Sequence, residues 1–211
     1  MSRFLFSHAV VLAVFATSLC LAAERSPSEA QQVLDQSAAE QKHTFMLFYR
    51  DDNQATRAMA QTMKAGVASR ADRANLCLVS VTDPAAQELV KRFGVSRAPL
   101  PFALAIAPNG ASTGLYSQKL SDTNIEASFA TPAMANCMKA MQERKLVLVC
   151  VNASGRSAKP AAVAEFLTDP DFNGRLAVVS VQANDPSEAL FLEQMEIDPK
   201  TVKTSSIVFL A

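Results

Sequence analysis

The feature that most constrains the fold of this chain is an internal repeat with an offset of one hundred residues. The stretch 75–81 reads Asn-Leu-Cys-Leu-Val-Ser-Val, and the stretch 175–181 reads Arg-Leu-Ala-Val-Val-Ser-Val. An Asp-Pro step follows each of them, Asp83-Pro84 in the first copy and Asp185-Pro186 in the second. Aspartate can accept the free amide hydrogens of a helix start and proline fits the first helical turn, so both steps predict helices. A repeat of this length indicates a duplicated domain rather than a short solenoid unit.

Each copy has the order helix, strand, helix, strand, helix, strand. Two further apolar runs in each copy predict strands, at 45–49 and 102–106 in the first copy and at 146–151 and 205–210 in the second. The first helix is expected to begin at Ser26-Pro27-Ser28-Glu29, a capping-box pattern with proline in its first turn. Strands that are apolar throughout and alternate with helices belong to sheets covered on both faces. The sequence therefore predicts an α/β fold.

The first copy continues beyond its third strand. A Pro-Asn-Gly turn at 108–110 predicts a return into an antiparallel edge strand at 115–120, followed by a closing helix from about Asp122. The second copy stops at Ala211, within the run that matches 102–107. We therefore expect two tandem domains, each with a central mixed sheet flanked by helices, of which the second is truncated. An open sheet edge and uncovered apolar surface favour pairing with another chain, so self-association is expected.

The N-terminal segment 1–23 is expected to be a secretory signal peptide, which leaves a first domain at 24–131 and a second at 132–211. Arg3 precedes an apolar run and then small residues, which is the order typical of such signals. No later stretch approaches the ~20 apolar residues needed to span a bilayer. The mature protein is expected outside the cytoplasm, secreted or periplasmic, with no membrane span. An uncleaved membrane anchor is the alternative.

Three cysteines follow the expected signal, Cys77, Cys137 and Cys150, and none belongs to a Cys-x-x-Cys motif. Cys77 and Cys150 lie within apolar runs, where cysteine usually serves as a small hydrophobic residue. An odd number of thiols allows at most one disulfide and leaves at least one thiol free.

The charge balance argues against a nucleic-acid partner. The chain has 20 basic and 20 acidic side chains, so its formal net charge is zero. Binding to phosphates depends on a basic face that releases counterions. The sequence also contains no glycine-rich phosphate loop, Gly-x-Ser-x-Gly elbow or His-Glu-x-x-His helix. No cofactor is expected, and a non-enzymatic role is favoured.

The segment 93–110 reads Phe-Gly-Val-Ser-Arg-Ala-Pro-Leu-Pro-Phe-Ala-Leu-Ala-Ile-Ala-Pro-Asn-Gly and resembles the thioredoxin-like superfamily. The match is to an aromatic-Gly-Val step, a variable loop, a cis-proline, an apolar strand and a Pro-Asn-Gly turn. The resemblance covers the first copy and most of the second, and implies a thioredoxin fold in each. It also implies a cis-proline opposite a redox dithiol. Spacing from Val95 favours Pro99 as that proline, whereas spacing to Gly110 favours Pro101, and we favour Pro101.

The chain departs from this family at the redox site. Asn53-Gln54-Ala55-Thr56 stands where the family carries Cys-x-x-Cys, and the corresponding stretch 153–156 of the second copy has no cysteine either. The second copy also has Thr204 where the first has Pro101. Dithiol exchange needs one thiolate to attack and a second thiol to resolve the mixed disulfide. Redox activity therefore does not follow from the resemblance.

The preferred hypothesis is a non-catalytic protein that binds polypeptide or assembles with partners. In the family that the chain resembles, the cis-proline loop presents backbone groups to an extended peptide, a mode that needs no dithiol. The expected contact surface is formed by Asn53, Gln54, Ala55, Thr56, Arg97, Pro99, Leu100 and Pro101.

Two other functions stay open. A monothiol redox protein would use Cys137, the least strand-like of the three cysteines. Alternatively, Met134, Cys137, Met138 and Met141 recur along one side of a helix, and such sulfur ligands suit Cu(I). An amphipathic linker helix that packs methionines between two domains explains the same spacing.

The remaining polar patterns do not predict a metal site. Asp169–Gly174 follows the first half of a calcium-loop pattern, but Ser180 stands where the bidentate glutamate belongs, so we interpret the stretch as a helix-to-strand turn. Asp51-Asp52 is interpreted as a solvated loop and His43 as a surface residue. Asn152-Ala153-Ser154 is a glycosylation sequon.

Overall fold

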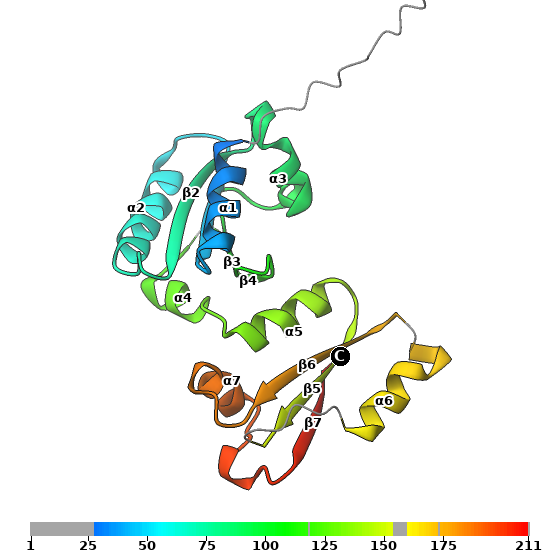
Figure 1. Cartoon of the computed structure of the whole chain (residues 1–211). Coiled ribbons are helices and arrows are strands. Elements are labelled where there is room, and N and C mark those ends of the chain that lie inside the picture. The colour runs from blue at the N-terminus through cyan, green and yellow to red at the C-terminus, as the bar shows by residue number, and fades with distance from the viewer. Residues whose placement is uncertain (1–27, 118, 154–159, 173, 211) are drawn as a thin grey trace, which may run out of the picture.

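The computed structural model describes residues 28–117, 119–153, 160–172 and 174–210. The expected signal peptide lies outside these ranges. So do residues 154–156, which belong to the stretch of the second copy that corresponds to Asn53–Thr56. The described chain forms two α/β bodies, each built on its own sheet, with one helix running between them (Figure 1).

The first sheet is mixed and has four strands. They are β1 (His43–Tyr49), β2 (Ala74–Ser80), β3 (Phe102–Ile106) and β4 (Ser112–Ser117). Their order is β2-β1-β3-β4, with β1 parallel to β2 and the other pairs antiparallel. The edge strand is confirmed, but it begins before the predicted Leu115. The Ala107 amide donates to the Ala111 carbonyl at 2.8 Å, which returns the chain to the sheet directly after the turn.

Helices cover both faces of this sheet. They are α1 (Glu29–Ala39), α2 (Gln54–Ala68), α3 (Gln87–Arg92) and α4 (Asp122–Ala127). Because side chains alternate along a strand, Met46 and Phe48 of β1 pack with α1 and α3, and Phe45 and Leu47 pack with α2 and α4. All four side chains are at most 1% exposed, so the strand is buried on both faces, as its apolar run predicts.

Helix α1 starts later than predicted. Its N-cap is Ser28, whose hydroxyl accepts a hydrogen bond from the Gln31 amide at 3.2 Å. The expected start at Ser26, which itself lies outside the described residues, is therefore wrong. Serine at 28 supplies the same acceptor directly before Glu29, so the helix needs no earlier cap.

The second sheet repeats the first three strands of the first sheet. Its strands are β5 (Leu146–Asn152), β6 (Leu176–Gln182) and β7 (Ser205–Leu210). They lie in the order β6-β5-β7, with β5 parallel to β6 and antiparallel to β7. The helices are α5 (Pro132–Gln142), α6 (Ala161–Thr168) and α7 (Ala189–Gln194). Among the described residues, no helix is long and apolar enough to cross a membrane.

The Asp-Pro steps form the same structure in both copies. Asp83 accepts a hydrogen bond from the Ala85 amide, and Asp185 accepts one from the Ser187 amide, each at 2.9 Å. Each step opens a short 3-10 turn that leads into α3 or α7. The two copies therefore match in strand order, strand direction and local capping, which supports the duplication.

The two sheets differ in how one face is covered. In the first domain α2 has 15 residues and, together with α4, buries its side of the sheet. In the second domain α6 has 8 residues, of which only Val163 is buried. Phe166, Ile207 and Phe209 are 44%, 43% and 52% exposed. This face of the second sheet is the less protected apolar surface.

Helix α5 belongs to both cores. One side packs against the turn between β3 and β4 through Ala135, and Met134 and Cys137 are buried in the second core. The Gln142 side chain also forms hydrogen bonds with the backbone of Ser112, at 3.0 and 2.7 Å. The interpretation as a linker helix that packs between the domains is therefore confirmed.

Candidate functional site

A small polar pocket lies at the carboxyl end of β1. Its volume is about 230 Å³, and its walls are Arg50, Asp51, Asn53, Thr56, Ala98, Leu100 and Pro101. Open α/β sheets place ligand sites at the carboxyl ends of their strands. The fold thus brings two distant segments, 50–56 and 98–101, to one position where a ligand could bind.

The first wall is the turn that leads into α2. The Asn53 side-chain oxygen accepts a hydrogen bond from the Thr56 amide at 3.0 Å, which makes Asn53 the N-cap. The buried Thr56 hydroxyl donates to the Asp51 carbonyl at 2.8 Å. These bonds satisfy groups that the turn and the helix start would leave unpaired, so the wall is held in one conformation.

The opposite wall is the loop before β3. Gly94 has a φ of 63°, a conformation that glycine adopts without the steric cost of a Cβ, and it redirects the chain after α3. The Leu100–Pro101 peptide bond is cis, so Pro101 rather than Pro99 is the cis-proline. Among the described residues, no backbone hydrogen bond holds the amide or the carbonyl of Leu100. Leu100 itself is partly exposed.

The structure brings together half of the predicted contact residues. Those that line the pocket are Asn53, Thr56, Leu100 and Pro101. Those that are exposed outside it are Gln54, Ala55, Arg97 and Pro99. Arg50, Asp51 and Ala98 line the pocket but were not among the predicted contact residues. Asp51, interpreted from the sequence as part of a solvated loop, is exposed and also lines the pocket, and the position after a central strand is a signal that applies to Arg50 as well.

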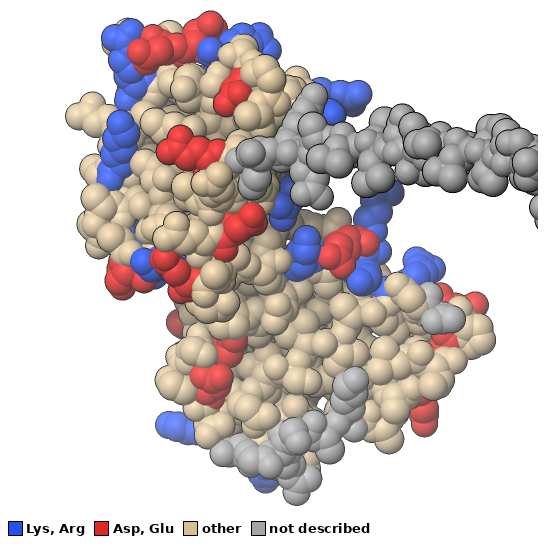
Figure 2. All heavy atoms as spheres, turned by 45° about the horizontal axis from the view of Figure 1, so that its top comes forward, with Lys and Arg blue, Asp and Glu red and all other residues tan. Residues whose placement is uncertain are grey.

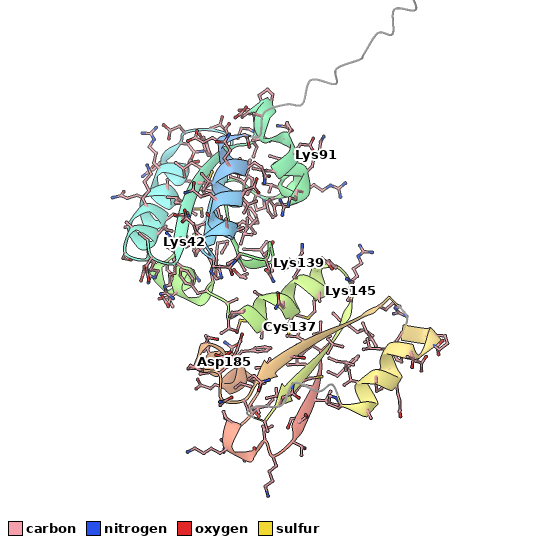
Figure 3. All side chains as sticks on the ribbon, in the orientation of Figure 1. Lys42, Lys91, Cys137, Lys139, Lys145 and Asp185 are labelled. Atoms are coloured by element: carbon pink, nitrogen blue, oxygen red, sulfur yellow. The ribbon has the colours of Figure 1, made fainter. Side chains whose placement is uncertain are left out.

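The described residues that line this pocket include no thiol. Cys77 on β2, Cys137 on α5 and Cys150 on β5 are buried and not joined by disulfides. Burial raises the pKa of Cys77 and of Cys137 to about 11, so both thiols are protonated at neutral pH. Cys137 lies on the side of α5 that faces the second domain (Figure 3).

The sulfur atoms of α5 serve mainly in packing. Met134 and Cys137 are buried, Met138 packs against both neighbouring cores, and Met141 is 38% exposed. Within the described ranges, no group of three His, Cys, Asp or Glu side chains is placed to hold a metal ion. The segment that begins at Asp169 forms the turn between α6 and β6.

His43 is not a surface residue, so that interpretation is wrong. The side chain is 7% exposed, and its Nε2 accepts a hydrogen bond from the Ala130 amide at 3.3 Å. The ring also lies edge-on to Phe129, with 5.0 Å between centroids. The partners follow His43 by almost ninety residues, which is why its own neighbours in sequence gave no sign of burial.

Asn152 lies in the interior of the second domain. It is 1% exposed, and its side-chain oxygen accepts a hydrogen bond from the Ser205 hydroxyl at 2.8 Å. A glycan needs an accessible amide, so the sequon is closed in this fold. Asp52, in contrast, is exposed and pairs with Arg57 at 3.1 Å, as a solvated loop residue does.

These features define the class of protein. A sheet of order β2-β1-β3-β4, with one parallel and two antiparallel pairs, carries helices on both faces and a cis-proline directly before β3. The described chain has a thioredoxin-like fold, built as two α/β domains in tandem.

Comparison with known proteins adds relatives in structure only. No protein-family model matches the sequence, and no curated protein sequence matches it significantly. A disulfide isomerase from Xylella fastidiosa Temecula1 is 16% identical, with 48% of this chain and 88% of that chain covered and a TM-score of 0.38.

Two longer structures cover most of the chain. The first two thioredoxin domains of Naumovozyma dairenensis Eps1p are 10% identical, with 90% of this chain and 87% of that chain covered and a TM-score of 0.33. Human ERp44 in its zinc-bound form is 10% identical, with 87% of this chain and 48% of that chain covered and a TM-score of 0.41. At these values none of them assigns an activity to this chain.

Proposed function

We propose that this chain is a non-catalytic, extracytoplasmic thioredoxin-fold protein that binds extended polypeptide at the cis-Pro101 pocket. The observation that carries the proposal is the pocket itself, where Asn53 and Thr56 face Pro101 without a thiol among the described lining residues. The fold thus keeps the geometry of a peptide-contacting loop while the reacting groups are missing.

Main-chain hydrogen bonds are the expected source of affinity. The amide and carbonyl of Leu100 can pair with the backbone of an extended segment, in the way that a strand adds to a sheet edge. Such bonds do not depend on the partner's side chains. Arg50 and Asp51 add charged side chains to the pocket. The positive charge of Arg50 complements acidic side chains of a bound polypeptide.

The charge distribution supports a protein partner over a polyanion. On the face shown in Figure 2, Lys and Arg side chains lie among Asp and Glu side chains, and no large patch of one sign covers it. A formal net charge of zero gives the same indication. An extracytoplasmic location rests on the signal-like segment 1–23.

The two alternative functions have weaker support. A monothiol redox protein needs an accessible thiolate, whereas Cys137 is 2% exposed and burial raises its pKa to about 11. Binding of Cu(I) by α5 would need sulfur atoms that are free to converge, whereas Met134 and Cys137 pack in the second core. A Cu(I) competition titration without detectable binding would remove the second alternative.

The test of the proposal is the binding of a permanently unfolded polypeptide, reduced and carboxymethylated, followed by fluorescence anisotropy of a label on that polypeptide. Arg50→Glu reverses the charge at the pocket rim, and we expect it to weaken binding about tenfold, or about 1.4 kcal/mol. Lys203→Glu changes the charge by the same amount at an exposed position of the second domain and should leave the affinity within about twofold.

Redox turnover is measured on the same samples. We expect no reduction of a small disulfide substrate above the rate of the buffer with thiol reductant alone. Equal affinities of the Arg50→Glu and Lys203→Glu variants would contradict the pocket assignment. Disulfide reduction that Cys137→Ala abolishes would establish the monothiol alternative instead.

A further inference from the structure

A single segment joins the two domains, and a side chain of the first sheet accepts a hydrogen bond from it. Helix α4 ends at Ala127 and α5 begins at Pro132, so the connection is four residues long. Within it, Phe129 packs against the core of the first domain, and the Ala130 amide donates to Nε2 of His43 at 3.3 Å. His43 is the first residue of β1, so the contact ties the connection to the centre of the sheet.

Two hollows flank this connection. One, of about 460 Å³, is lined by His43, Phe129, Ala130 and Pro132 together with residues of α5. The other, of about 630 Å³, lies on the side of α4 and α7 and shares Phe129, Ala130 and Pro132. The hollows leave open space beside Ala130, whereas Ser128, which is 1% exposed, and Phe129 stay packed in the first domain.

The hydrogen bond fixes the protonation state of His43. A neutral histidine has one donor nitrogen and one acceptor nitrogen, and Nε2 is the acceptor here, so the proton of the neutral ring is on Nδ1. Protonation would place an N–H on Nε2 as well. The Ala130 amide would then face a donor and lose its acceptor, and the connection would keep only the packing of Phe129 against β1.

We infer that His43 is a pH-sensitive contact between the first sheet and the segment that leads into α5: its neutral ring holds the Ala130 amide, and its protonation breaks that hydrogen bond and opens the segment at Ala130.

The charged groups around His43 favour the neutral ring. Arg73 stacks over the Phe129 ring, with 4.0 Å from the guanidinium carbon to the ring centroid, and lines the same hollow as His43. Glu126 of α4 pairs with Arg73 at 2.8 Å. Lys42, the neighbour of His43 in sequence, pairs with Glu40 at 3.2 Å.

Burial and then the charge of Arg73 lower the pKa of His43 from 6.5 to about 4. The folded pKa lies below the ordinary one, so the contribution of His43 is complete above pH 6.5 and is lost as the pH falls toward 4. Hydrogen bonds from Arg70 and Arg73 hold the pKa of Glu126 below its usual range, so this carboxylate does not titrate in the same window. The contact at Ala130 is therefore expected to weaken as the pH falls below 6.5.

The experiment measures hydrogen exchange of the Ala130 amide in the full chain by NMR, with the protection factor corrected for the intrinsic rate at each pH. If the pKa of His43 is 6.5 once the hydrogen bond is broken, the protection factor of the Ala130 amide should fall roughly 30-fold between pH 7.5 and pH 5. The Val149 amide in the centre of the second sheet is the internal reference and should keep its protection.

The matched variant is His43→Gln. Its side-chain amide oxygen can accept the Ala130 amide hydrogen and does not titrate, so protection of Ala130 should change less than about threefold over the same range. An equal fall in wild type and variant, or constant protection in wild type, would overturn the proposal. If His43→Gln does not fold, the wild-type difference between Ala130 and Val149 alone decides, since the proposed contact predicts a fall at Ala130 only.

Discussion

The two domains share one skeleton and differ in what surrounds it. Three strands, their directions and the Asp-capped turns are the same in both, because these elements are fixed by buried apolar positions and local capping. The covering of one sheet face and the loop before the third strand differ. A full-length α2 and a cis-proline occur in the first domain, whereas the second has a short α6 and Thr204. A duplicated fold thus preserves its core while its surface and its loops diverge.

The largest expected effect is a difference in stability between substitutions on α2 of the first domain and on α6 of the second. Met63 of α2 is fully buried, whereas Phe166 of α6 is 44% exposed on the corresponding face. Met63→Ala should cost about 2–5 kcal/mol, because it leaves a cavity in a packed core. Phe166→Ala should cost less than about 1 kcal/mol. Urea unfolding followed by far-ultraviolet circular dichroism measures both, and equal losses would mean that α6 covers its sheet as fully as α2.

The reactivity of Cys77 and Cys137 shows whether the thiols of both domains are equally protected. Burial raises the pKa of Cys77 and of Cys137 to about 11, so at neutral pH each should hold roughly 100-fold less thiolate than an exposed cysteine. Alkylation by iodoacetamide at pH 7.5, followed by peptide mass spectrometry, should therefore be slow at both sites and fast once the protein is unfolded in guanidinium. Fast alkylation of Cys137 alone would show that the two thiols differ in accessibility and would support the monothiol alternative.

Glu188 distinguishes the second domain at a position where the first has Ala86. Its Oε1 accepts a hydrogen bond from the Ala133 amide at 2.8 Å, at the start of α5, and the side chain is 5% exposed. Glu188→Ala should cost about 1–3 kcal/mol because a buried amide loses its acceptor. Glu188→Gln keeps an acceptor oxygen and should cost less in the same urea experiment. Equal costs would show that the hydrogen bond does not hold α5.

The smallest expected effect concerns self-association through the face of the second sheet that α6 covers only in part. Ile207 and Phe209 of β7 are 43% and 52% exposed, and Ser205–Leu210 has neither a charge nor a proline to discourage pairing. We expect sedimentation velocity to show weak, concentration-dependent association, which Phe209→Lys reduces about tenfold. Leu115→Lys, at a 64% exposed position of β4, is the control in the first domain. A monomer at all concentrations would contradict this expectation.

Much of the fold is predictable from local patterns in the sequence. Apolar runs located the strands other than β4, which the Pro-Asn-Gly turn predicted with shifted bounds, and the spacing to Gly110 favoured Pro101 as the cis residue. These features depend on near neighbours along the chain. The pocket was found only in part, because Ala98 is brought to Asn53 by the packing of β3 beside β1.

The error at His43 has a different cause. Histidine is intermediate between the mostly buried and the mostly exposed residue types, and nothing beside His43 in sequence indicates a partner. Its burial depends on Phe129 and Ala130, which follow the last helix of the first domain and return to the start of β1. A contact between such distant segments is a property of the assembled fold, so no local pattern can reveal it.

The central claim is that the cis-proline pocket binds polypeptide without exchanging electrons. The most direct measurement is an NMR chemical-shift map of the isotope-labelled chain on addition of the carboxymethylated unfolded polypeptide. The account expects the amides of Asn53, Thr56 and Leu100 to shift together and to saturate, with the strands of the second domain unchanged. Shifts confined to the second domain, or none at the pocket at millimolar polypeptide, would contradict it.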